Sequence, residues 1–235
     1  MAQGNSSWLA RRIEGAVRAT LTGTYNSIKI DPAKYLVHLR RAYGLPIDSF
    51  RGMGAVPLPV VEHIADKAIA ASAKVALAEG AGLGVAGIVT VIPDVGFLTT
   101  ISIRMIQKLS LIYGFEYSTE DEMAELWIAA ASAAGVDLGK ELLEREVLER
   151  FVPRVIERIA VKAGSEMAEK WAARLVPLAS SVLGAALNYY FIRGWGRRAQ
   201  RHFRERHLMA RTYFDRGQPA AGSVSAPIIH QPPDY

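Results

Sequence analysis

The sequence predicts an all-α protein, a single multi-helix bundle with a long basic C-terminal helix and a disordered tail. Apolar residues recur with the 3.6-residue period of helices along most of the chain, and residues that favour helix ends stand beside them. The alternating, β-branched runs that indicate a sheet are missing, apart from the short stretch GIVTVI. We expect three parts: residues 1–27 as an N-terminal helical arm, 28–216 as the helical domain, and 217–235 as a disordered Pro-rich tail.

Helix-end signals define the first half of the domain. The stretch IDPAKYLVHLRRAYG has Asp31 as N-cap, Pro32 in the first turn and Gly44 as its stop. After the turn-rich residues 45–59, a helix begins near Val61. One stripe of apolar and small residues follows the helical period there: Val61, Ile64, Ala65, Ala68, Ala71, Ser72, Val75 and Ala76.

The second half of the domain shows the same signals. Residues 99–114 form a helix that ends in glycine, and Thr119 with Glu122 has the spacing of a capping box that opens the next. That helix stops at Gly135. The stretch LGKELLEREVLERF and a helix entered at Pro153 follow it.

Charge is unevenly distributed along the chain, whose formal net charge is +5. Residues 116–149 hold ten acidic side chains and two basic ones, whereas residues 193–216 hold eight arginines and two acids. The basic segment lies on the last long helix, which we predict to begin at about Pro177. The two segments can pair within the fold, or give the molecule two faces of opposite sign.

The pattern Gly82-x-Gly84-x-x-Gly87 matches the dinucleotide-binding fingerprint. That fingerprint requires a strand before it and a helix after it, within a βαβ unit. Here the preceding segment has a helical period, and Pro93 interrupts the segment that follows. We therefore predict no cofactor and interpret these glycines, with Gly80, as small residues that allow close helix packing.

Two stretches, 81–103 and 175–192, lack charge for nearly the length of a membrane span, except for Asp94 in the first. Spanning a bilayer takes about 20 apolar residues, so each stretch can be a span, a buried central helix or part of an interfacial hairpin. Asp94 and Asn188 need polar partners in every case, and Arg104 is a candidate for Asp94, either as a structural ion pair or within a functional site. The predicted buried polar site comprises Glu79, Asp94, Arg104 and Asn188.

The Arg-rich helix is the predicted functional surface. Ile192, Trp195, Ala199 and Phe203 repeat along one side, with arginines on the others. A basic amphipathic helix of this kind suits anionic lipid headgroups; binding of nucleic acid is an alternative, and so is docking on the bundle beside the acidic segment. The residues that we assign to membrane and anion binding are Arg193, Trp195, Arg197, Arg198, Arg201, Phe203 and Arg204.

Other chemistry has little support in the sequence. The chain has no Cys, so disulfides and thiolate metal sites are excluded. The five histidines are scattered, and neither a P-loop nor a nucleophile elbow is present. We predict no catalytic residue and no metal ligand, which favours a non-enzymatic role. The terminal PPDY matches a WW-domain ligand, and we interpret it as a chance match.

Three stretches, taken in order, resemble the EcsC family of bacterial proteins. They are KIDPAKYLVHLRRAYGLPIDS, ADKAIAASAKVALAEGAGLGVAGIVTVIPDVGFLTTISIRMIQKLSLIYGFE and RLVPLASSVLGAALNYYFIRGWGRRAQRHFRER. The resemblance implies an all-helical domain, named for the third member of an exporter operon whose first members form an ATP-binding cassette transporter. It brings no catalytic residues. The positions that match its motifs are Glu79, Gly80, Pro93, Asp94, Tyr113, Gly114, Pro177, Gly184 and Asn188.

From these observations we expect a non-enzymatic, membrane-associated accessory protein of a bacterial exporter or envelope process. The first residues lack a signal-peptide core, so we expect a cytoplasmic protein that is peripheral to the inner membrane or inserted in it. The expected partners are an anionic membrane surface and an exporter or envelope protein, rather than nucleic acid. The alternative is a helical bundle that binds a small molecule or acts as an enzyme, with a polar site around Asp94, Arg104 and Asn188.

Overall fold

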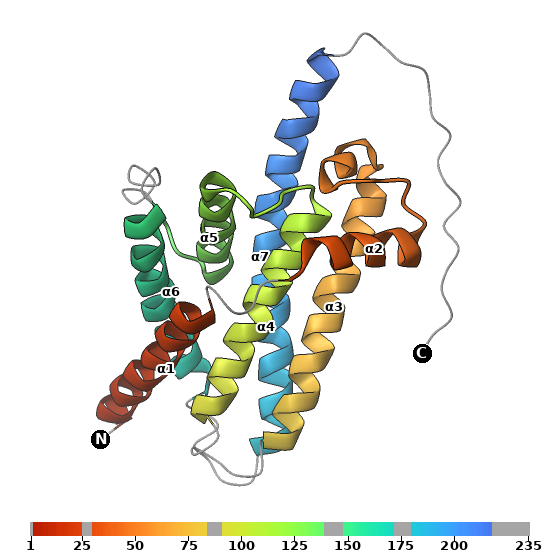
Figure 1. Cartoon of the computed structure of the whole chain (residues 1–235). Helices are drawn as coiled ribbons and strands as arrows, with labels where there is room; N and C mark the ends of the chain where they lie inside the picture. The colour runs from red at the N-terminus through yellow and green to blue at the C-terminus, as the bar shows by residue number, and fades with distance from the viewer. Residues whose placement is uncertain (1, 25–29, 84–90, 139–147, 172–179, 218–235) are drawn as a thin grey trace.

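The computed structural model describes residues 2–24, 30–83, 91–138, 148–171 and 180–217. Within these residues every regular element is helical, which confirms the all-α bundle and its long basic C-terminal helix (Figure 1). The predicted tail from residue 218 onward lies outside the described residues. The elements are α1 (Ala2–Thr24), α2 (Pro32–Tyr43), the 3-10 helix η1 (Phe50–Ala55), α3 (Leu58–Leu83), α4 (Val91–Ile112), α5 (Glu120–Ala134), α6 (Leu148–Trp171) and α7 (Ser180–Gly217).

The centre of the bundle is formed by α3, α4 and α7. α7 packs along α3, and α4 contacts both, while α5 lies against α6 and α7 (Figure 1). α1 packs on α6 and α4 and buries Leu9, Ile13, Val17 and Leu21. The predicted N-terminal arm, residues 1–27, thus contains a helix that shares its buried side with α6 and α4.

The predicted helix ends are confirmed where capping chemistry marks them. The Asp31 side chain accepts a hydrogen bond from the Lys34 backbone N–H at 3.1 Å. The capping box is complete, because Thr119 accepts from the Glu122 N–H and the Glu122 carboxylate accepts from the Thr119 N–H. The predicted stops have the left-handed backbone that glycine adopts without strain, with φ of 63°, 89° and 72° at Gly44, Gly114 and Gly135.

The stripe on α3 differs in part from the prediction. Ala71 and Val75 are exposed, and Ile69 and Ala73 are fully buried in their place. Two neighbouring stripes of apolar and small residues follow the helical period in this Ala-rich sequence. Residue size does not distinguish them, so the packing of α7 decides which stripe is buried.

The two prolines that were expected to interrupt or open helices lie inside them. α4 begins at Val91, so Pro93 is in its first turn, where a missing N–H has no intrahelical partner to lose. α6 begins at Leu148 rather than at Pro153. The exposed Pro153 removes one bond near the start of the helix, where water can hydrate the freed carbonyl group.

The four helices that flank the two uncharged stretches each have an end at the same end of the bundle. α3 ends at Leu83 and α4 begins at Val91, and α6 ends at Trp171 before α7 begins at Ser180. All four helix ends lie toward the lower end of Figure 1. The described ends of these four helices lie in or next in sequence to the stretches 81–103 and 175–192, of which 84–90 and 175–179 lie outside the described residues. We call this end of the bundle the apolar end.

Among the described residues, one helical segment is long and apolar enough to cross a membrane, Val95–Ile112 of α4, with a mean hydropathy of 1.3. Most of this segment, 72%, is buried inside the bundle, as it is in the central helix of a helical core. It overlaps the predicted candidate 81–103 only in part. The other candidate, 175–192, lies partly outside the described residues.

Candidate functional site

The apolar side of α7 faces the protein core. Trp195 is 2% exposed and lies 4.9 Å from the ring of Phe191, while Phe203 is 1% exposed and stacks on Phe115 at 6.2 Å. This placement differs from the expectation that Trp195 and Phe203 contact lipid. The small residues of α3 and α7 allow the two helices to approach closely, so the stripe is covered by protein.

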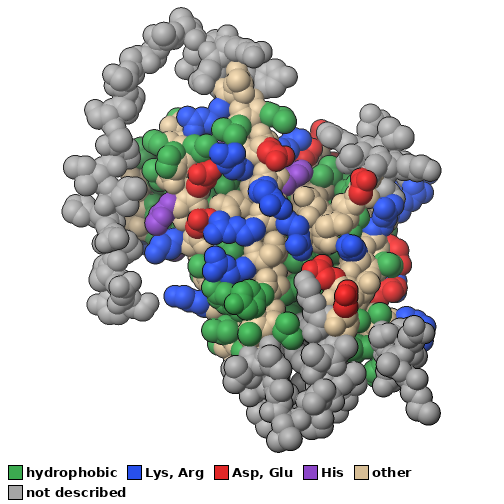
Figure 2. All heavy atoms as spheres, turned by 180° about the vertical axis from the view of Figure 1, so that it is seen from behind, with side chains coloured by type: hydrophobic (Ala, Val, Ile, Leu, Met, Phe, Trp, Pro, Cys, Tyr) green, Lys and Arg blue, Asp and Glu red, His purple; other side chains and the backbone are tan. Residues whose placement is uncertain are grey.

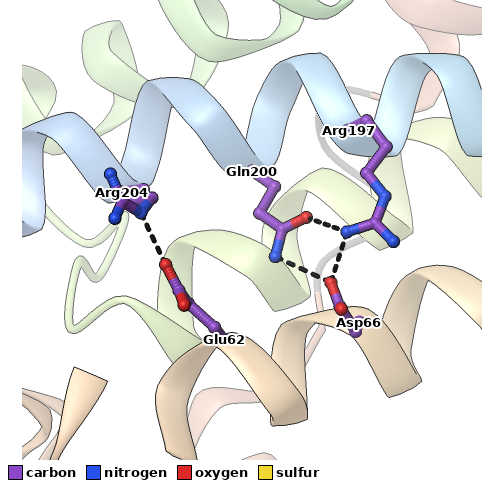
Figure 3. Close-up of polar contacts among 5 residues, drawn as sticks. All are labelled: Glu62, Asp66, Arg197, Gln200 and Arg204. Carbon is purple, nitrogen blue, oxygen red and sulfur yellow. Dashed lines mark hydrogen bonds and ion pairs between the residues drawn. The ribbon is translucent and has the colours of Figure 1, made fainter. Parts of the chain in front are cut away.

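Two acidic residues of α3 hold the outer side of α7 (Figure 3). Arg197 Nη1 and Gln200 Nε2 both donate to Asp66 Oδ1, at 2.5 and 2.9 Å, and Arg197 also donates to Gln200 Oε1 at 2.9 Å. One turn farther along α3, Glu62 Oε1 accepts a hydrogen bond from Arg204 Nε at 2.5 Å. These pairs fix the antiparallel register of α3 and α7, and they use two of the arginines that we assigned to anion binding.

Further contacts join α7 to α5. Arg198 Nε donates to the Ala133 carbonyl oxygen, and Arg206 lies 3.0 Å from Glu125. Glu125 belongs to the acidic segment, so the predicted pairing of the basic and acidic segments occurs at this point. Most of the ion pairing of α7 is with Glu62 and Asp66 instead, which are not part of the acidic segment. Their four-residue spacing, which puts them on one face of a helix, is the signal in the sequence that could have identified them.

Arg193 and Arg201 have a different setting on α7. Arg193 Nη1 donates to Tyr189 Oη at 2.8 Å, and its guanidinium group lies 5.5 Å from the centre of that ring. Within the described part of the chain, neither Arg193 nor the exposed Arg201 has a carboxylate within 4.0 Å. Their charges are therefore available to an external anion.

Exposed apolar side chains lie beside Arg193, toward the apolar end. Val75 is 52%, Leu77 40% and Tyr190 70% exposed. The Ile69 side chain contacts Gly196. Val75 and Tyr190, each six residues farther toward the apolar end, are therefore level along the two antiparallel helices, while Val75 lies on the side of α3 opposite to Asp66. On the face shown in Figure 2, hydrophobic side chains gather below a band of Lys and Arg. The combination resembles the apolar tip and basic rim of a membrane-binding surface.

The structure describes the predicted polar site only in part. Asn188 is fully buried, whereas Arg104 is exposed on α4, so these two residues do not share an interior site. Glu79 and Asp94 lie in α3 and α4, but their side chains are outside what the structure describes. In the described part of the chain, no three His, Asp or Glu side chains gather in a way that could hold a metal ion.

His207 is a buried titratable group that the sequence analysis left without a role. Its Nδ1 lies 2.9 Å from the Tyr113 carbonyl oxygen, which only accepts, so Nδ1 carries the hydrogen. Burial lowers the pKa of His207, Arg211 lowers it further, and the bond to Tyr113 opposes this shift. Burial also lowers the pKa of His202, whose ring lies 3.9 Å from Glu125. Both rings are therefore favoured as neutral in the fold.

We expect the melting temperature to fall as the pH is lowered below about 6.5, the ordinary pKa of histidine. In that range the unfolded chain binds protons that the folded chain does not, so stability rises with pH. In His207→Asn, which keeps a donor near the Tyr113 carbonyl, this slope should be smaller than in the parent. His63→Asn, at an exposed position, is the control and should keep the full slope. Parallel pH profiles for parent and His207→Asn would contradict the assignment.

A pocket of about 660 Å³ lies elsewhere, where α1, α5 and α6 meet. Val152 and Ile156 line its apolar part, and Arg18 and Glu157 form a bidentate ion pair at its edge, with N–O distances of 2.6 and 2.7 Å. Arg18 lowers the pKa of Glu157, which keeps the pair charged. None of the predicted site residues lines this pocket.

Sequence comparisons relate the chain to known proteins. The chain is 28% identical over 134 residues to protein EcsC of Bacillus subtilis (strain 168), a match that covers 57% of each protein. The chain thus spans little more than half the length of that relative. No solved structure matches the chain. The sequence model of the EcsC protein family matches residues 5–208, from α1 to the Arg-rich part of α7, and the chain belongs to the EcsC protein family.

Proposed function

We propose that this EcsC family protein is a non-enzymatic accessory protein that binds a bacterial membrane surface through its apolar end. The single observation that carries the proposal is that α3, α4, α6 and α7, which flank the two uncharged stretches of the sequence, all have an end on the same side of the bundle. Val75, Leu77 and Tyr190 expose apolar surface beside them. Burying such surface in the membrane interface is favourable, by roughly 25 cal/mol per Å².

The geometry supports peripheral binding better than a transmembrane arrangement. The apolar segment of α4 is mostly enclosed by other helices, and the ion pairs on the outer sides of α3 and α7 begin about five turns from the apolar end. Moving such charged groups to the middle of a bilayer costs several kcal/mol each. A shallow insertion of the end alone leaves these ion pairs in water, and it brings Glu79 and Asp94, which are near the ends of α3 and α4, to the level of the headgroups. The link to an exporter or another envelope process rests on the family resemblance.

The proposal is tested by flotation of the purified protein with lipid vesicles. The double variant Val75→Ser, Tyr190→Ser should bind about tenfold more weakly, because it removes roughly 1–2 kcal/mol of interfacial burial. The matched control is Val37→Ser, Met209→Ser, at positions that are 46% and 63% exposed on α2 and on the far part of α7. The control should bind like the parent. If the parent ignores vesicles, or if both double variants weaken equally, membrane binding through the apolar end is wrong.

A further inference from the structure

We propose that Lys74 and Arg193 form a binding site for the headgroups of anionic phospholipids at the rim of the apolar end. This inference rests on the proposed function and deepens it, because it names the lipid class and the two side chains that recognise it. It concerns a specific part of α3 and α7, rather than the Arg-rich helix as a whole.

Arg193 lies closer to the apolar end than the other arginines of α7. The outward stripe of α7 runs from Tyr190 through Arg193 to Arg201. At a rise of 1.5 Å per residue, Arg193 lies about 5 Å along the axis from Tyr190, and Arg201 lies about 16 Å from it. The Debye length at physiological salt is about 8 Å, so a headgroup layer at the level of Tyr190 attracts Arg193 and is largely screened from Arg201.

Neither cation of the proposed site has an acidic partner in the described part of the chain. Arg197 and Arg204 are held by Asp66 and Glu62, whereas Arg193 has no carboxylate partner in the described part of the chain. The exposed Lys74 likewise has no ion-pair partner among the described residues. Its position beside Val75 on α3 brings it to nearly the same level as Tyr190. Within the described part of the chain, two cations without an ion-pair partner thus lie at the level of the exposed apolar side chains, and the side chain of Glu79, beyond Lys74 on α3, is outside that part.

Arg193 is held in one orientation by Tyr189. Its guanidinium group donates one bond to the Tyr189 hydroxyl and lies near the face of that ring, which leaves its remaining N–H groups free to donate. A guanidinium group that is oriented in advance loses less rotamer freedom when it binds a phosphate. Tyr189 and Tyr190, whose rings meet edge to face at 5.7 Å, are also suited to the interface between headgroups and acyl chains.

Binding of the full chain to phosphatidylcholine vesicles, with and without phosphatidylglycerol, tests the inference. Each basic side chain near an anionic surface contributes about 1 kcal/mol, so Lys74→Gln, Arg193→Gln should lose about 30-fold in affinity for the anionic vesicles. Its affinity for pure phosphatidylcholine should not change. The control, Lys67→Gln, Arg201→Gln, removes the same charge from exposed positions about 10 Å farther from the apolar end, and should lose less than about threefold.

The outcomes separate the two proposals. If the parent binds both vesicle types equally, the headgroup site is wrong and membrane binding stands. If the parent binds neither, both fail. Equal losses in the two double variants would show a diffuse charge effect and overturn the site. Tighter retention on duplex DNA than on anionic vesicles, at the same salt, would assign these cations to nucleic acid instead.

Discussion

Gly196→Val is expected to lower the free energy of unfolding by about 3 kcal/mol, the upper part of the range for an overpacked core. A Cβ atom at residue 196 would lie 2.8 and 2.9 Å from two carbons of Ile69, and 3.0 Å from Met105 Sδ. Ile69 is on α3 and Met105 is on α4, so the missing side chain sets the distance at which the three central helices meet. Restoring it forces them apart.

Gly194 provides the matched control, two residues away on the same helix. A Cβ atom there has only Arg198 Nη1 nearby, at the ordinary contact distance of 3.8 Å. Gly194→Ala should therefore raise stability by roughly 0.5–1 kcal/mol, because alanine loses less backbone entropy in a helix. Urea unfolding of both variants, with Gly196→Ala beside them, measures the difference. If Gly196→Ala stabilises the protein as much as Gly194→Ala, the close contact between α3 and α7 does not exist.

The local sequence predicts the ends of the helices, but it does not predict where two helices come close together. The capping residues Asp31 and Thr119 act on their own backbone neighbours, so local sequence predicts them correctly. Close approaches depend on helices that are distant in the chain. Gly196 meets α3, and at Gly164 of α6 a Cβ atom would lie 3.0 Å from the Ala10 carbonyl oxygen of α1. No local pattern separates these two positions from the other glycines.

The same limit applies to the candidate site. The sequence identified α7 as basic and amphipathic, and Arg193 was among the residues assigned to anion binding. It could not separate Arg193 from Arg197, because the separation depends on Asp66, which is 131 residues from Arg197 in the chain. Periodicity also does not distinguish a stripe that meets lipid from one that meets protein, because both environments are apolar. The exposed Val75 was predicted to be buried for the same reason.

Two aromatic residues of α7, Phe203 and Tyr190, are expected to have opposite effects on stability and on vesicle binding. Phe203→Ala should lower the free energy of unfolding by about 3–5 kcal/mol, since its ring is fully buried against Phe115 and its loss leaves a cavity in the core. Tyr190→Ala, at a position 70% exposed, should change stability by no more than about 0.5 kcal/mol.

Vesicle binding should show the reverse order, measured at a temperature where both variants remain folded by circular dichroism. Tyr190→Ala should bind vesicles more weakly than the parent, because it removes an aromatic ring from the inserting end. Phe203→Ala should bind like the parent, since the apolar end, Lys74 and Arg193 are unchanged. A stable Phe203→Ala variant that no longer binds vesicles would show instead that the apolar stripe of α7 leaves the bundle to meet the membrane, and that the docked helix is the unbound state.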